Sequence, residues 1–178
     1  ATSTVNFSTT TTNGKTSYAW SINTNIGLSP LTGTGDLPSF TAINTGTTPI
    51  TATITVTPTY NGTSICNGTS KTFTITVNPS GQVNQPTNQV VCNNTATSTV
   101  NFSTTNTVGT TSYAWSFDTN IGLIPLTGSG NIPSFTAINT GTTPIVATIT
   151  VIPTFTNGAT NCIGSSKTFT ITVNPSAQ

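Results

Sequence analysis

Few side chains in this 178-residue sequence could take part in acid–base, nucleophilic or metal chemistry. There are three cysteines and no histidine, arginine or glutamate, and the charged residues are Lys15, Lys71, Lys167, Asp36 and Asp118. General acid–base and nucleophilic catalysis need titratable groups held close together. Without histidine, neither a His-based triad nor an imidazole metal ligand can form. We therefore expect no enzyme, no cofactor and no metal site.

The sequence contains an internal repeat, and the few reactive residues are distributed over its two copies. The stretches that begin at Ala1 and Ala96 differ at 12 of their first 60 positions, and one additional residue then aligns Cys66 with Cys162. The segment "GQVNQPTNQVVCNNT" joins the copies. Such a period is typical of tandem arrays. We expect two domains from a longer array, 1–82 with its first strand truncated, and 83–178, nearly complete and including the linker.

The two aspartates occupy different positions in the two copies. Asp36 corresponds to Asn131, and Asp118 corresponds to Asn23. A carboxylate at either position therefore cannot be a functional feature of every copy. A calcium site built from Asp118, Asn120 and backbone carbonyls is an alternative for the second copy, but turn residues are the simpler interpretation.

An odd number of cysteines calls for an explanation in a secreted protein. We expect disulfides, with one cysteine whose partner lies outside the given sequence. With one bridge per copy, Cys92 would pair with Cys162, and the partner of Cys66 would lie upstream of the sequence. A disulfide that closes the long loop from Cys92 to Cys162 would stabilise the folded state by about 4 kcal/mol. Three reduced thiols in an intracellular protein are the alternative.

Alternation of threonine with apolar residues predicts β-strands throughout. "PITATITVTP" and "KTFTITVNP" alternate with period 2, as do their counterparts in the second copy. Shorter strands are predicted around Val5 and Phe7, around Val100 and Phe102, and, in the second copy alone, around Val90 and Cys92. Turn-rich stretches between them predict about seven strands per copy, hence an all-β fold of antiparallel sandwiches. The predicted core includes Trp20, Trp115, Phe73 and Phe169.

Composition limits the partners. Charged residues make up 3% of the chain and the net charge is +1, so a nucleic-acid backbone has no basic surface to bind. No apolar run is long enough for membrane insertion. Lys71 and Lys167, at the start of the last strand of each copy, are explained by protection of a sheet edge. The linker prolines Pro79 and Pro86 favour extended backbone and units arranged end to end.

The stretches "YAWSFDTNIGL", "GSGNIPSFTAINTGTTPIVATITVIPT" and "CIGSSKTFTITVNP" resemble the PKD-like repeats of very large surface proteins of gliding and related Bacteroidota. The "YAWSF" strand is similar to the "YxWDF" strand of PKD domains, although "DTNIG" and "NTNIG" replace the usual "GDG" turn. The resemblance implies an immunoglobulin-like sandwich, export to the cell surface, and a role as a stalk in adhesins and gliding-motility filaments. It implies no catalytic residues.

Three functions follow as hypotheses. The first is a non-catalytic repeat of an extracellular filament or stalk that presents a distal adhesive tip, with neighbouring repeats as partners. The second is a polysaccharide-binding or spacer module of a secreted enzyme, in which Tyr60 and Phe155, at corresponding positions, would stack on surface glycans. The third is a subunit that polymerises with other filament chains into a fibre or sheath, for example by strand exchange.

Overall fold

The longest runs of alternating residues form the two longest strands of the computed structural model, which describes residues 1–11 and 13–177. They are β3 (Ile50–Asn61) and β9 (Ile145–Asn157). In β3 the side chains of Ala52, Ile54 and Val56 are buried, whereas the threonines between them are partly or fully exposed. The period of 2 in the sequence therefore becomes one apolar face on each central strand.

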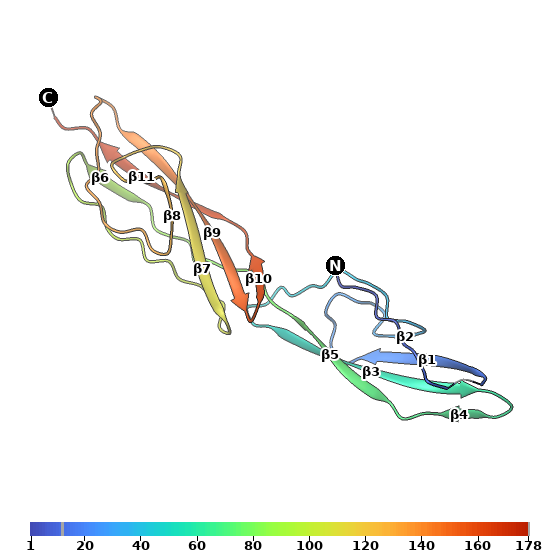
Figure 1. Ribbon diagram of the computed structural model, residues 1–178. Helices are drawn as coiled ribbons and strands as arrows, with labels where there is room; N and C mark the ends of the chain where they lie inside the picture. The colour runs from blue at the N-terminus through green and yellow to red at the C-terminus, as the bar shows by residue number, and fades with distance from the viewer. Residues whose placement is uncertain (12, 178) are drawn as a thin grey trace. The chain divides into compact units, whose positions relative to one another are not determined.

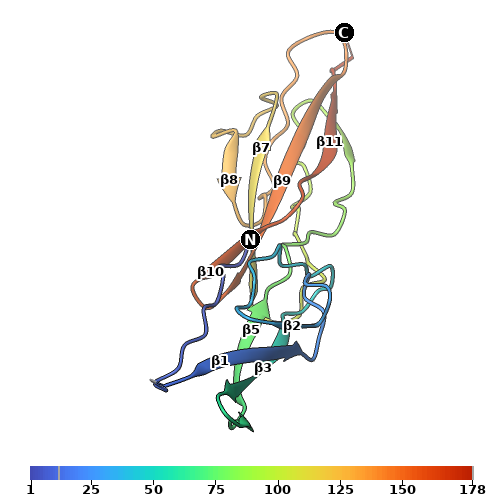
Figure 2. The ribbon, with the colours of Figure 1, turned by 90° about the vertical axis from the view of Figure 1, so that its right-hand side faces the viewer.

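Each central strand organises a separate sheet (Figure 1). The remaining strands are β1 (Lys15–Ile22), β2 (Thr32–Thr34), β4 (Ile65–Asn67), β5 (Lys71–Val77), β6 (Gln89–Cys92), β7 (Thr110–Phe117), β8 (Thr127–Ser129), β10 (Thr160–Ile163) and β11 (Lys167–Asn174). In the first sheet β3 pairs with β1, β4 and β5, and β2 pairs with β1. The second sheet has the order β6-β11-β9-β7-β8, with β10 also paired to β9. Figure 2 shows β8, β7, β9 and β11 side by side.

The chain divides into two compact units, unit 1 (Ala1–Asn78) and unit 2 (Pro79–Gln178). The boundary lies four residues before the expected one, because the start of the linker belongs to unit 2. The backbone N–H of Gly81 donates to the carbonyl of Cys162 at 3.0 Å, and that of Gln82 donates to Asn106 Oδ1 at 2.8 Å. Residues 79–82 are thus part of the second unit.

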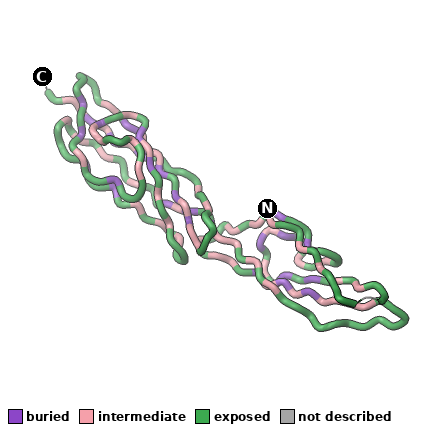
Figure 3. The backbone as a smooth tube through the Cα atoms, in the orientation of Figure 1, coloured by how far each residue is buried: buried purple, intermediate pink, exposed green. Residues whose placement is uncertain are grey.

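A layer of extended, mostly irregular segments covers the apolar face of each sheet. In unit 1 this layer contributes Ile26, Leu28, Leu37 and Phe40 to the core. It is held by an isolated bridge between Val5 and Leu37. The corresponding bridge in unit 2 joins Val100 and Ile132. The result is an all-β, sandwich-like arrangement in each unit, in which burial alternates along the strands (Figure 3).

The predicted aromatic core is largely confirmed. Trp20, Trp115 and Phe169 are buried, and Phe73 is partly buried against the core of unit 1. Each indole lies over a glycine of the neighbouring short strand: a Cβ on Gly33 would approach Trp20 within 2.2 Å, and one on Gly128 would approach Trp115 within 2.3 Å. The described residues include no helix that could cross a membrane.

Three details differ from the predicted strands. Val5 and Val100 form only isolated bridges, without the strands predicted around them. The pairing of β6 with β11 is parallel, unlike every other strand pair described. In β6 the core-facing residue is Val91, whereas Val90 is 68% exposed and Cys92 is also exposed. The residues on which this strand was predicted, Val90 and Cys92, therefore lie on its exposed face.

The predicted disulfide between Cys92 and Cys162 is wrong, because the two residues lie at opposite ends of unit 2. Cys92 pairs with Asn174, next to the pair Val173–Ile145, whereas Cys162 pairs with Phe155. From Ile145 to Phe155 the strand β9 advances about 33 Å at its usual rise. A disulfide needs Cα atoms within about 7 Å of each other. Cys66, Cys92 and Cys162 are all free thiols.

This placement predicts that the monomeric protein carries three titratable thiols and no internal bridge. Thiol titration with an aromatic disulfide should therefore count three groups per chain without denaturant, with Cys162 reacting more slowly than the exposed Cys66 and Cys92. Addition of a reductant should leave the melting temperature unchanged. A non-reduced digest of monomer that yields a peptide linking Cys92 to Cys162 would contradict the strand register.

Candidate functional site

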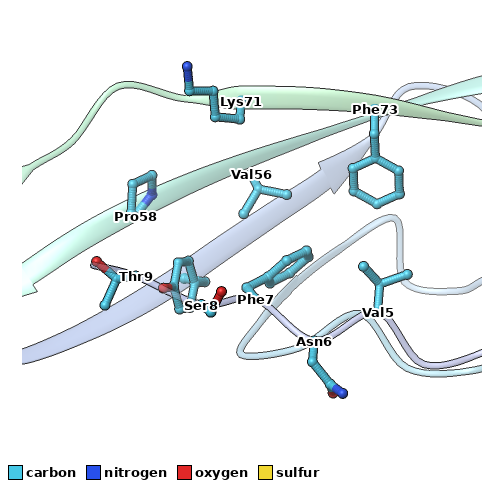
Figure 4. A pocket seen from close by; sticks show the side chains of 10 residues that line it. Val5, Asn6, Phe7, Ser8, Thr9, Val56, Pro58, Lys71 and Phe73 are labelled. Carbon is cyan, nitrogen blue, oxygen red and sulfur yellow. The ribbon is translucent and has the colours of Figure 1, made fainter. Parts of the chain in front are cut away.

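A groove of about 330 Å³ lies in unit 1 beside the last strand, β5 (Figure 4). One wall is the segment Val5–Thr9, and the other comes from β1, β3 and β5. Its lining residues are Val5, Asn6, Phe7, Ser8, Thr9, Tyr18, Val56, Pro58, Lys71 and Phe73. We call it the β5 groove. Because its lining is mostly apolar with a few polar groups at the rim, it is the candidate binding site of unit 1.

Apolar side chains form the floor of the β5 groove and polar ones stand at its rim. In Figure 4, Phe73 and Val56 point from the sheet toward the opposite segment, where Phe7 and Val5 lie, while Asn6 and the ammonium group of Lys71 point away. Phe7 also packs against Tyr18, with ring centroids 5.6 Å apart. The floor therefore suits apolar side chains better than a charged ligand.

The hydroxyl of Tyr18 is the unusual polar group of the groove. It is buried, and it finds no hydrogen-bond partner among the described residues. Its counterpart in unit 2 is Tyr113, whose pKa is raised by burial and lowered in part by a hydrogen bond with Thr104. A buried hydroxyl without a partner is costly, so the two units differ in how complete this region is.

In unit 2 the corresponding place is covered by the chain itself, by the segment 79–92. Its Asn84 backbone N–H donates to the Ser103 carbonyl at 2.8 Å, and the Gln85 side-chain amide donates to the Thr168 carbonyl at 2.8 Å. The backbone N–H of Thr170 donates to Asn88 Oδ1 at 2.9 Å. From Gln89 onward the segment becomes β6, which pairs with β11. We call 79–92 the covering segment.

The covering segment also explains why the predicted glycan contacts fail in unit 2. Phe155 is 0% exposed, and Gly81 lies so close that a Cβ there would meet the backbone nitrogen of Phe155 at 2.9 Å. Phe155 cannot stack on a sugar, so that part of the prediction is wrong. Its counterpart Tyr60 is only partly buried, with its ring against Gly14 and Gly62.

The two aspartates act as hydrogen-bond acceptors for backbone amides. Asp36 Oδ1 accepts from the Phe7 N–H at 2.8 Å, and in unit 2 Asn131 Oδ1 accepts from the Phe102 N–H at 2.9 Å. Asp118 Oδ1 accepts from the Thr148 N–H at 2.8 Å, and Asn23 Oδ1 does so for Thr53 at 2.8 Å. An amide oxygen thus performs the same task, which explains why the residue types exchange between the units.

No metal centre is assembled within residues 1–11 and 13–177, where no group of three or more histidine, cysteine or acidic side chains comes together. One side-chain oxygen of each of the two residues of the considered calcium site accepts a backbone hydrogen bond. Asp118 Oδ1 accepts from Thr148, and Asn120 Oδ1 accepts from the Gly122 N–H at 2.9 Å. The three cysteines are likewise not brought together in either unit.

Sequence reasoning did not predict the β5 groove of unit 1. The signal was available in the linker, where Val83 and Val91 are the apolar residues that become buried or packed on the core of unit 2.

The chain matches no protein-family model, and no curated protein matches it either.

The carboxylate of Asp118 should make a small, separable contribution to the pH dependence of unit 2. The backbone N–H of Thr148 lowers the pKa of Asp118, so its contribution to stability is present above the unfolded pKa of about 4 and is lost as the pH falls through the lower folded value. Asp118→Asn should remove this acid dependence while keeping the bond, as Asn23 does in unit 1. Thermal melts between about pH 2 and 7 measure this dependence. Asp118→Ala, which loses the bond, should make unit 2 less stable at every pH.

Unit 1 should unfold before unit 2, since its β5 groove is open. Two thermal transitions are expected, assigned by a matched pair of variants at the fully buried Ile54 and Ile149. Ile54→Ala should lower the temperature of only the first transition, and Ile149→Ala that of only the second. In each case the free energy of unfolding of the affected unit should fall by about 2–5 kcal/mol. Calorimetry of the full chain is the measurement. A first transition that responds to Ile149→Ala would reverse the assignment.

Proposed function

We propose that this chain is a non-catalytic structural segment of an extracellular filament or stalk, built from tandem PKD-like, immunoglobulin-like units and presenting a distal binding tip at the cell surface. Its partners would be neighbouring repeats of the same kind. Surface attachment or gliding motility is the setting that the family resemblance suggests. The proposal rests on the path of the chain through unit 2.

That path runs lengthwise. The chain enters unit 2 beside Cys162 and Phe155, where Gly81 is hydrogen-bonded, and it leaves after Asn174, beside Cys92. These two ends are separated by most of β9, which has 13 residues and therefore a length of about 43 Å. Units traversed in this way would each add their full length to a longer chain, as a stalk requires.

The first and last strands of unit 2 are also arranged to carry tension. β6 and β11 are neighbours and run parallel, so a force that pulls the two ends of the unit apart acts along both strands in opposite directions. The hydrogen bonds of the ladder then share the load in shear instead of opening one by one. Without an internal disulfide, this ladder and the apolar core are the sources of mechanical resistance.

The contacts of the residues that sequence analysis singled out support a structural role. The aspartates accept hydrogen bonds from distant backbone amides, a task that asparagine performs at the corresponding positions. Phe155, one of the two candidate sugar-stacking residues, is buried. Both observations favour a stalk over an accessory module that holds polysaccharide.

Immunogold electron microscopy of the producing cells, with an antibody against residues 83–178, tests the proposal. Labelled threads hundreds of ångströms long, with a repeat of about 40 Å per unit, are expected. Label confined to compact secreted particles would reject the stalk and favour the spacer module of a secreted enzyme.

A further inference from the structure

The outer edge of β5 is open in unit 1, whereas the corresponding edge of β11 is paired in unit 2. Within the described part of the chain, β5 pairs only with β3, while β11 pairs with β9 on one side and with β6 on the other. An unpaired edge presents a row of backbone donors and acceptors to a further strand. The β5 groove lies directly beside this edge, since Lys71 and Phe73 of β5 line it.

Burial differs between the units in the way that a missing cover would produce. Phe169 is 2% exposed and Val100 is 7% exposed, whereas their counterparts Phe73 and Val5 are only partly buried. Pro153 is buried, but its counterpart Pro58 is not. These side chains are of the same type in both units, so the difference comes from what lies on top of them in unit 2, namely the covering segment.

The contacts that hold the covering segment in unit 2 can be made again in unit 1. The groups that bind Asn84, Gln85 and Asn88 are backbone atoms of Ser103, Thr168 and Thr170. The corresponding residues Ser8, Thr72 and Thr74 have the same types. The register found in β11 would place the strand with its Val90 and Val91 opposite Thr76 and Val77. An arriving Val91 side chain would then meet the apolar core of unit 1.

One anchor does not carry over. In unit 2 the side chain of Asn106 binds the start of the covering segment: it accepts from the Gln82 N–H, and its amide donates to the Ser80 carbonyl. The corresponding residue of unit 1 is Thr11, whose backbone N–H donates to Thr9 Oγ1. A single hydroxyl cannot reproduce both contacts of an amide. The recognised part of the strand therefore begins near Val83.

We propose that the β5 groove of unit 1 is a strand-binding site that takes up an extended segment with the sequence chemistry of Val83–Cys92, docked parallel to β5. The inference rests on the proposed function, because the occupant is the linker that enters unit 1 in a longer tandem chain. Exchange of 79–92 between two copies of this chain is not the source, since it would uncover unit 2 in order to cover unit 1 and gain nothing.

The site thus joins each unit to the linker in front of it. The apolar floor accepts the buried valines of the strand, and the edge of β5 supplies backbone hydrogen bonds. The arrangement is β-augmentation, in which backbone pairing gives affinity and the alternate side chains give specificity. Pairing is then specific for linkers of this repeat type, because the apolar residues must fall on the core-facing side.

The test adds a fluorescent peptide "GQVNQPTNQVVSNNT", which is residues 81–95 with Cys92→Ser, to the full chain. Saturable binding at one site per chain is expected, together with an increase of several degrees in the first thermal transition and no change in the second. Two peptide variants provide matched controls. Val91→Asp places a charge against the core and should weaken binding at least tenfold, whereas Val90→Asp lies on the exposed side and should bind like the parent.

A second arm removes the dependence on peptide affinity. Residues 79–95, with the same cysteine replaced, are fused directly before Ala1, and the fused chain should show the raised first transition while remaining a monomer. The same fusion carrying Val91→Asp should not. If neither peptide nor fusion raises the first transition, or if Val90→Asp and Val91→Asp act alike, the strand site is rejected. Threads seen by immunogold labelling would still support the stalk, so the two failures are distinguishable.

Discussion

The closure of one sheet edge governs the rest of this structure. In unit 2 the segment 79–92 lies along β11, caps Phe155, and brings Val91 onto the core. Backbone hydrogen bonds set the direction in which this segment runs, and Val83 and Val91 supply its apolar contacts with unit 2. Where this segment is present, the neighbouring side chains of the last strand are buried. Where it is not, as in unit 1, the same side chains line a groove and the hydroxyl of Tyr18 is left without a described partner. Closure of the sheet edge and burial of the last strand thus depend on the same piece of chain.

Scarcity of charge shapes the surface and limits the chemistry. Charged residues make up 3% of the chain. Its loops are held instead by asparagine, threonine and two aspartate side chains, whose oxygens accept hydrogen bonds from backbone amides. Asn139 is an example: buried in unit 2, it donates to the carbonyls of Thr143 and Val173 at 2.9 and 2.8 Å. Such contacts require a polar atom and not a charge. A surface of this kind can differ between the two units without loss of fold, as the exchange of Asp118 for Asn23 illustrates.

The sequence predicted the features that depend on local alternation and missed those that depend on how segments meet. The apolar faces of β3 and β9 and the burial of both tryptophans follow from period 2 and from aromatic size. The face of β6 does not, because "VVC" has apolar residues on both sides and only its pairing with β11 decides that Val91 turns inward. The disulfide failed for a related reason: cysteine parity carries no information on distance, and Cys92 and Cys162 sit at opposite ends of β9. The groove was not predicted because it depends on which residues the segment 79–92 covers in unit 2, and no described segment covers their counterparts in unit 1.

Amide hydrogen exchange along the last strand of each unit tests the account most directly. The N–H of Thr170 donates to Asn88, and by the alternation of strand geometry the N–H of Thr172 faces the same edge, toward β6. The corresponding amides of unit 1 are those of Thr74 and Thr76, at an edge without a described strand partner. Residue-resolved exchange in the full chain should therefore show Thr170 and Thr172 protected and Thr74 and Thr76 exchanging far faster. Equal protection of the two pairs would contradict the claim that the covering segment is what completes a unit.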